Sequence, residues 1–347
     1  MQLSVIKDWQ EISHLAPAWN DLLACCSASH VPFLRYEYQE AWWKNLGGGE
    51  WQNAELNIII GYQNNGQIVG IAPFFRVKNQ SHHHSFEEIP SLMLLGSIEI
   101  SDYLDFIVRQ PELSEFTEAL VDFLDGQSVS EWQTLDLYNI PESSPTLVHL
   151  QAASGQRGWK FDQKQLHPCP YIPLPGDWEV YLSGIDKKQR HEIRRKMRRA
   201  EEGSQPIRWY VVNDVGSLDS EMEDFLSLMA RDPEKDRFLT SAMRSQMHEI
   251  ARSALKAGWL QLAFLEINGE KAAGYMNFDF AGHIWVYNSG INFDYRELSP
   301  GWVLLGYLLK WANENQRESF DFMRGGEDYK YRFGGIDQYI ARVTIQR

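Results

Sequence analysis

The chain has 347 residues, of which 44% are hydrophobic and 23% are charged. This length suggests about two domains, and the composition excludes a disordered or fibrous chain. No run reaches the roughly 18 consecutive apolar residues that a membrane-spanning helix requires, and the N-terminus lacks the apolar core of a signal peptide, so we expect a cytoplasmic protein. The formal net charge of −14 argues against non-specific nucleic-acid binding by the whole surface.

The first half of the chain predicts a hairpin with helices before it and alternating strands and helices after it. Two apolar runs, 56–62 and 68–77, flank Asn64-Asn65-Gly66-Gln67, which is typical of a hairpin turn. The other expected elements, in chain order, are helices 16–23 and 38–46, strand 102–108, helix 113–124, strand 134–138 and helix 146–153.

The second half repeats this order of elements. It predicts helices 222–229 and 242–257, a hairpin of 260–267 and 271–280, strand 283–293, helix 300–315 and strand 319–323. Between the halves, the segment 167–175 holds four prolines, which block helices and central strands. We therefore expect two domains, 1–166 and 176–347, joined by a proline-rich junction, and an α+β fold in which helices cover a mixed sheet (α/β/α).

The strongest local signal is the strand, turn and helix around residue 300. Ser299 is suited to cap the helix with its hydroxyl, Pro300 to the first helical position, and Gly301 to close approach of a ligand to the backbone. The free N–H groups of such a helix start can bind a phosphate or pyrophosphate. A well-capped core helix is the alternative, and on spacing alone it is the more common one.

These residues resemble the core of the GNAT acyltransferases. The order hairpin, strand, turn, buried helix and strand is that of the superfamily, and Arg296-Glu297-Leu298-Ser299-Pro300-Gly301 is similar to its acyl-CoA loop, with Ser299 in place of the first glycine. The closing segment 320–330 resembles the branch that contains the FemABX peptidyltransferases and the CelD/BioF2-like acetyltransferases. Further matches to this branch are Arg190-x-x-Ile193-Arg194-Arg195-Lys196, Ser101-Asp102-Tyr103-Leu104-Asp105, and Phe33 with Trp42-Trp43.

The resemblance implies two tandem GNAT-like domains with a cleft between them. Only the C-terminal copy keeps a cofactor-type loop, so Arg296, Ser299, Gly301 and Trp302 are its candidate cofactor residues, and the N-terminal copy is expected to build the acceptor side. The CelD-like motifs favour acyl-CoA, foremost acetyl-CoA, as donor, whereas FemABX proteins use aminoacyl-tRNA. No metal is expected.

Acyl transfer to an amine also requires a donor to the oxyanion that develops on the thioester carbonyl. Tyr287, Asn288 and Ser289 lie in an otherwise apolar strand, where polar groups are costly unless they are paired. We take the segment 287–290 as the candidate for this role. The alternative is that these groups are simply satisfied at the end of the strand.

Proton transfer is assigned to the segment that follows the last strand of the second half. Asp321, Glu327, Tyr329 and Lys330 are the candidates, with Lys330 and Glu327 foremost. Burial would shift the pKa of a glutamate or tyrosine there, and Lys330 could neutralise a phosphate or the tetrahedral intermediate. An ordinary polar loop is the alternative for most of these residues.

Residues 187–199 contain eight lysines and arginines and one glutamate, a local charge of +7. Ile193, Met197 and Ala200 form a thin apolar stripe, so we expect a surface helix. Arg190 and Arg194 are predicted to bind an anionic acceptor or the phosphates of the donor, with a solvated helix as the alternative.

In the first half, Asp102, Tyr103 and Asp105 are the candidates for recognising sugar hydroxyls or a cationic amine, and capping of a strand end is their alternative. The sequence thus predicts an N-acyltransferase that uses acyl-CoA and a small-molecule amine acceptor, such as an amino sugar, a cell-envelope or polysaccharide precursor, or an amino acid. A FemABX-like transferase with an aminoacyl-tRNA donor and a non-catalytic binding protein remain the alternatives. The oligomeric state is not predicted.

Overall fold

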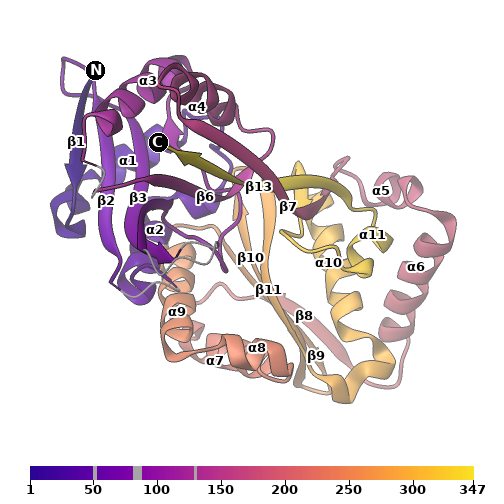
Figure 1. Ribbon diagram of the computed structural model, residues 1–347. Coiled ribbons are helices and arrows are strands. Elements are labelled where there is room, and N and C mark those ends of the chain that lie inside the picture. Colours follow the sequence, from indigo (N-terminus) through magenta and orange to yellow (C-terminus); the bar gives the residue numbers. More distant parts are fainter. Residues whose placement is uncertain (50–52, 81–87, 129–130) are drawn as a thin grey trace. The chain divides into compact units, whose positions relative to one another are not determined.

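The computed structural model describes residues 1–49, 53–80, 88–128 and 131–347 (Figure 1). It divides into two compact units. Unit 1 comprises Met1–His167 and Gln338–Arg347, and unit 2 comprises Pro168–Asp337. The predicted division assigned residues 338–347 to the second domain. They lie in unit 1 because the last strand, β13 (Ile336–Gln346), pairs with β6 (Thr134–Pro141) of that unit.

Unit 1 is built around one mixed sheet. Its strands follow the order β1 (Gln2–Ile6), β2 (Glu55–Tyr62), β3 (Ile68–Gln80), β4 (Glu88–Leu94), β6 and β13, and all of these neighbours are antiparallel except β4 and β6. The helices and short 3-10 turns of this unit are η1 (Trp9–Leu15), α1 (Ala16–Leu23), η2 (Pro32–Leu34), α2 (Tyr36–Leu46), η3 (Gln110–Glu112), α3 (Leu113–Asp125) and α4 (Pro145–Gln156).

The predicted strand 102–108 is wrong for most of its length. Only β5 (Ile107–Val108) is a strand, and it pairs with β3. Tyr103 has a left-handed φ of 57°, which interrupts an extended chain. Asp102 and Asp105 therefore do not lie on one strand face, although both side chains are buried.

The proline-rich junction also forms a strand, contrary to the prediction. β7 runs over Lys160–Pro173 and carries the chain from unit 1 into unit 2. The prolines fit because their carbonyl groups alone are used on one side: Pro170 accepts from the N–H of Phe322, and Pro168 accepts from the N–H of Gly325, each at 2.9 Å. At these two positions only the proline carbonyl groups are used, so the missing N–H groups are not required there.

The strands of unit 2 also pair in a mixed pattern, and helices lie on both of their faces (Figure 1). Its strands follow the order β7, β12 (Ser319–Asp321), β11 (His283–Ile291), β10 (Glu270–Phe280), β9 (Leu260–Ile267) and β8 (Ile207–Val211), and only β11 and β12 are parallel. The helices and the 3-10 turn of this unit are α5 (Trp178–Gly184), α6 (Lys187–Glu201), α7 (Leu218–Met229), α8 (Pro233–Phe238), α9 (Ser241–Lys256), η4 (Phe293–Leu298), α10 (Pro300–Glu314) and α11 (Asp328–Arg332).

One face of the unit 2 sheet is covered by α10 with α5 and α6, and their buried side chains form a single apolar core. Helix α6 has the predicted character, because Ile193, Met197 and Ala200 are its buried residues and Asp186 caps its N-terminus. Helices α7 and α9 cover the other face.

Two glycines that face each other on β10 and β11 allow α7 to lie close to the sheet. Gly274 pairs with Gly290. A Cβ atom on Gly274 would lie 3.0 Å from the Phe225 ring of α7, and one on Gly290 would lie 2.6 Å from the backbone nitrogen of Met229. The backbone of α7 cannot rotate away as a side chain could, so Gly290 fixes the end of α7 and the start of the chain that leads to α8.

We expect Gly290→Ala to lower the free energy of unfolding by about 1–3 kcal/mol, because the added methyl group would overlap the α7 backbone. Gly184→Ala is the matched control, since a Cβ atom there meets nothing within 4 Å. Urea unfolding of both variants measures the difference, and equal midpoints for Gly290→Ala and the wild type would contradict this account of the packing.

Candidate functional site

The candidate site lies in unit 2, where β11 and β12 diverge. The two strands pair only through His283–Ser319, Ile284–Phe320 and Trp285–Asp321. Strand β11 then continues to Ile291 beside β10 alone. Its edge toward β12 is open from Val286 onward, so the backbone groups on that edge must find partners other than a strand.

A β-bulge lies at the start of this open edge. Met276 pairs with Asn288, whereas Asn277 pairs with Val286, so Tyr287 is the extra residue on β11. A bulge re-aims the neighbouring backbone groups and side chains. The ring of Tyr287 packs against Phe278, with ring centroids 5.1 Å apart.

Side chains occupy both backbone groups of Ser289 on β11. Its N–H donates to Oδ1 of Asn288 at 2.9 Å, and its carbonyl accepts from Nζ of Lys235 at 2.5 Å. Lys235 Nζ also contacts the Ser289 hydroxyl at 3.4 Å. Both Asn288 and Ser289 were predicted at this position, but Lys235, on the short helix α8, was not. Lys235 lies 54 residues from Ser289 in the sequence, and no local pattern indicates that the two residues are in contact.

The end of β11 leads through η4 into the N-terminus of α10. The predicted side-chain cap is wrong: Ser299 makes no cap hydrogen bond and has a left-handed φ of 52°. Its carbonyl accepts from the N–H of Val303 at 3.0 Å, while its own N–H closes η4 on Arg296. Within the described parts of the chain, no group accepts from the N–H of Gly301 or Trp302, so the first turn of α10 keeps free donors.

Gly301 was predicted to allow a ligand to approach the backbone, but its missing side chain is explained by packing within the protein. A Cβ atom there would lie 2.6 Å from Cδ1 of Ile291. The glycine therefore lets α10 approach the end of β11, and the space that its missing side chain leaves is filled by the protein itself. The Trp302 ring packs against Phe333 at a tilt of 49°, with ring centroids 4.6 Å apart. Nζ of Lys196 lies 4.1 Å from the centroid of the Trp302 ring.

Two tyrosines lie beside this helix start. The Tyr275 hydroxyl donates to the carbonyl of Gly301 at 3.4 Å. Burial raises the pKa of Tyr329 well above its usual value, and the neighbouring Tyr275 and Glu327 raise it further. The Tyr329 phenol is therefore protonated at neutral pH and can donate a proton.

Lys330 is almost fully buried and its ammonium is occupied by the protein itself. It donates to the carbonyls of Met323 (3.2 Å), Arg324 (2.9 Å) and Gly325 (2.9 Å), and it lies 2.8 Å from the Glu327 carboxylate. Its ammonium thus holds the turn after β12. The catalytic role predicted for Lys330 stays a prediction.

The other predicted proton-transfer residues are close by. Asp321, at the end of β12, is buried and accepts from the N–H of Met323 at 2.7 Å. Glu327, which pairs with Lys330, has a side chain that is 58% exposed. The structure thus brings Asp321, Glu327, Tyr329 and Lys330 together around one turn.

The arginines of α6 that were predicted to bind an anion contact groups of the protein itself. Arg190 donates to the carbonyls of Leu182 and Ser183 at the end of α5, and Arg194 pairs with Glu179. Arg199, which was not singled out, is exposed and has no partner among the described residues. Arg296 is 80% exposed and lies 3.9 Å from Glu297.

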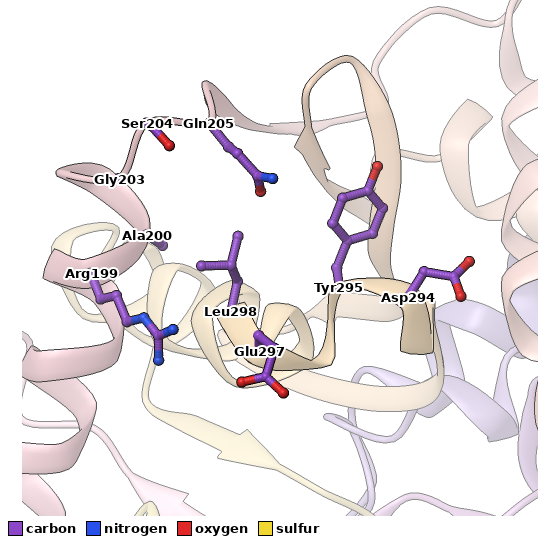
Figure 2. Close-up of a pocket in the computed structure, with 9 residues that line it drawn as sticks. All are labelled: Arg199, Ala200, Gly203, Ser204, Gln205, Asp294, Tyr295, Glu297 and Leu298. Atoms are coloured by element: carbon purple, nitrogen blue, oxygen red, sulfur yellow. The ribbon is translucent and has the colours of Figure 1, made fainter.

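Arg199 borders a pocket of about 430 Å³ between the end of α6 and η4 (Figure 2). Its lining residues are Arg199, Ala200, Gly203, Ser204, Gln205, Asp294, Tyr295, Glu297 and Leu298. The pocket therefore adjoins the segment that resembles an acyl-CoA loop, and it offers one guanidinium and two carboxylates.

The predicted acceptor-binding residues of the first half, Asp102, Tyr103 and Asp105, lie in unit 1 and are buried there. The Asp105 carboxylate accepts from the N–H of Phe106 and from the Ser144 hydroxyl, and burial raises its pKa to about 6. The Tyr103 hydroxyl accepts from Nε2 of Gln338 at 3.0 Å. Asp102 is buried.

Residues 187–331 match the sequence model of the acetyltransferase (GNAT) domain. This segment has a GNAT-like fold. The diverging strands, the bulge and the start of α10 all fall inside it. Among the described residues, no group of three or more histidine, cysteine, aspartate or glutamate side chains is placed to hold a metal ion. No helix in the described ranges is long and apolar enough to span a membrane.

The whole chain is similar in fold to several solved structures. FemX is 13% identical, with 99% of this chain and 97% of that chain covered and a TM-score of 0.62. A conserved protein of unknown function from Bacteroides thetaiotaomicron is 10% identical over all of both chains, with a TM-score of 0.58. L-PGS from Bacillus licheniformis is 13% identical, with 92% and 93% covered and a TM-score of 0.52. No curated protein matches the sequence significantly.

We expect Lys330→Met to lower the free energy of unfolding by about 2–4 kcal/mol, because it leaves three carbonyl groups and a carboxylate without their cation. Lys188→Met, at an exposed position of α6, is the control. Urea denaturation distinguishes the two interpretations of Lys330: a variant as stable as the wild type but without transferase activity would support the catalytic role.

Proposed function

We propose that the protein transfers an acyl group, foremost acetyl, from acyl-CoA to the amine of a small-molecule acceptor. The observation that carries this proposal is the open edge of β11, which begins at a bulge and ends at a helix start with free N–H donors. An extended amide-bearing chain such as pantetheine can pair with a strand edge, and a pyrophosphate can bind at a helix N-terminus.

The bulge is the proposed position of the reacting carbonyl. The tetrahedral intermediate carries negative charge on its oxygen, and backbone N–H groups near Tyr287 and Asn288 would stabilise it. The amine nitrogen adds to the thioester carbon, and the carbon–sulfur bond breaks when the tetrahedral intermediate collapses. Tyr329 would give its proton to the departing thiolate, and Glu327 is the proposed acceptor of the amine proton.

The second candidate is an aminoacyl-tRNA donor, as in the FemABX proteins. It is favoured by the likeness in fold to FemX over almost the whole chain and by the basic helix α6. The acceptor would again be an amine, and an amino sugar or a cell-envelope precursor fits either donor. A non-catalytic binding protein is the third alternative.

Titration with acetyl-CoA, CoA and total tRNA, followed by melting temperature and calorimetry, tests the proposal. A ligand that binds only the folded state raises the free energy of unfolding, by about 2.7 kcal/mol at a concentration of 100 times its Kd, and therefore raises the melting temperature. We expect a shift with acetyl-CoA and CoA and none with tRNA. A shift with tRNA alone would select the FemABX-like donor, and no shift with any of them would contradict the transferase proposal.

A further inference from the structure

Lys235 differs from the other cations of unit 2 in what surrounds its charge. Its ammonium contacts only the carbonyl and the hydroxyl of Ser289, and no carboxylate of the described residues lies within ion-pair distance of it. An ammonium has three N–H donors, so one of them remains without a protein acceptor.

The charge is also partly removed from water. The side chain is half-buried, and burial lowers the pKa of Lys235, although Asp232 and Glu327 act from a distance in the opposite direction. A desolvated charge without a counter-charge costs free energy. By contrast, the nearby Arg231 pairs with Asp294 at 3.0 Å, and Lys330 pairs with Glu327.

The position of this ammonium relative to the proposed reaction site is fixed by packing. Gly290 holds the end of α7 against β11, and α8 follows directly, with its N-terminus capped by Asp232. Lys235 thereby reaches Ser289, two residues beyond the bulge at Tyr287. Its free donor lies next to the open edge of β11.

We propose that Lys235 binds an anionic group, a carboxylate or a phosphate, of the amine acceptor. The inference rests on the proposed acyl transfer, because it places the acceptor beside the bulge. A ligand anion would supply the missing counter-charge and take the third N–H donor. The acceptor class is then an amine that carries an acidic group near its nitrogen, rather than a plain amine or an amino sugar without an acidic group.

Matched acceptor pairs test this inference on the full-length protein. We would measure Kd by calorimetry for α-amino acids against their C-terminal amides, and for glucosamine 6-phosphate against glucosamine. The amino acid pairs measure a preference for a carboxylate, and the glucosamine pair measures a preference for a phosphate. The wild type is expected to bind the charged member of at least one pair tenfold or more tightly.

Substitutions of Lys235 then assign the preference to its charge. Lys235→Gln keeps an N–H donor for the Ser289 carbonyl but removes the charge, so the preference should fall to within twofold. Lys235→Arg should retain it, and Lys188→Met is the control for an exposed lysine. The melting temperature of each unliganded variant shows that it is folded; if Lys235→Gln does not fold, Lys235→Met takes its place.

Two results would overturn the inference: a wild type that binds both members of every pair equally, or a Lys235→Gln variant that keeps the preference. Acetyl-CoA binding, measured on the same preparations, reports the proposed function separately. Acetyl-CoA binding without a charge preference removes the role of Lys235 and leaves acyl transfer standing, whereas a Lys235-dependent preference without acetyl-CoA binding does the reverse.

Discussion

The candidate site depends on the early end of pairing between β11 and β12. A strand that loses its neighbour exposes N–H and C=O groups that must be satisfied in another way. In this protein Asn288 and Lys235 satisfy the groups of Ser289, and they do so with side chains. Side chains can move aside for a ligand more easily than a paired strand can. The open edge is therefore hydrogen-bonded in the free protein and can still be reached by a ligand.

The glycines of this region act through packing. Gly290 allows the backbone of α7 to touch β11, and Gly301 allows the start of α10 to touch Ile291. The C-terminal end of the open edge, at Gly290 and Ile291, is thereby fixed by helices on both faces of the sheet. The turn after β12 is held by the buried ammonium of Lys330, which leaves Tyr329 beside Tyr275 and the first turn of α10.

Much of the fold could be predicted from local patterns. The hairpins, the helix α10 and the buried stripe of α6 follow from apolar periodicity and turn residues, which are local properties of the chain. β7 was missed because its prolines argue against a strand, and their use of carbonyl groups alone depends on partners about 150 residues away. The strand predicted around Asp105 is interrupted by the left-handed φ of Tyr103, which no local apolar pattern indicates.

For the candidate site, the sequence indicates which residues interrupt or follow the apolar strands, but not which contacts their side chains make. The sequence indicates the polar interruption at Asn288 and Ser289 and the cluster after β12. It does not indicate that the Lys330 ammonium donates to backbone carbonyl groups or that Arg190 donates to the carbonyls at the end of α5. Both contacts depend on how the backbone around them is folded. Lys235 and Arg199 carry no motif, and only the folded chain distinguishes them from other surface cations.

Amide hydrogen exchange with and without saturating CoA tests the central claim most directly, because it reports on individual backbone N–H groups. The account predicts slower exchange on the open edge of β11, around Tyr287 to Ile291, and at Gly301 and Trp302 in the first turn of α10. Bound CoA that leaves these amides unchanged, or that protects a different part of unit 2, would contradict it.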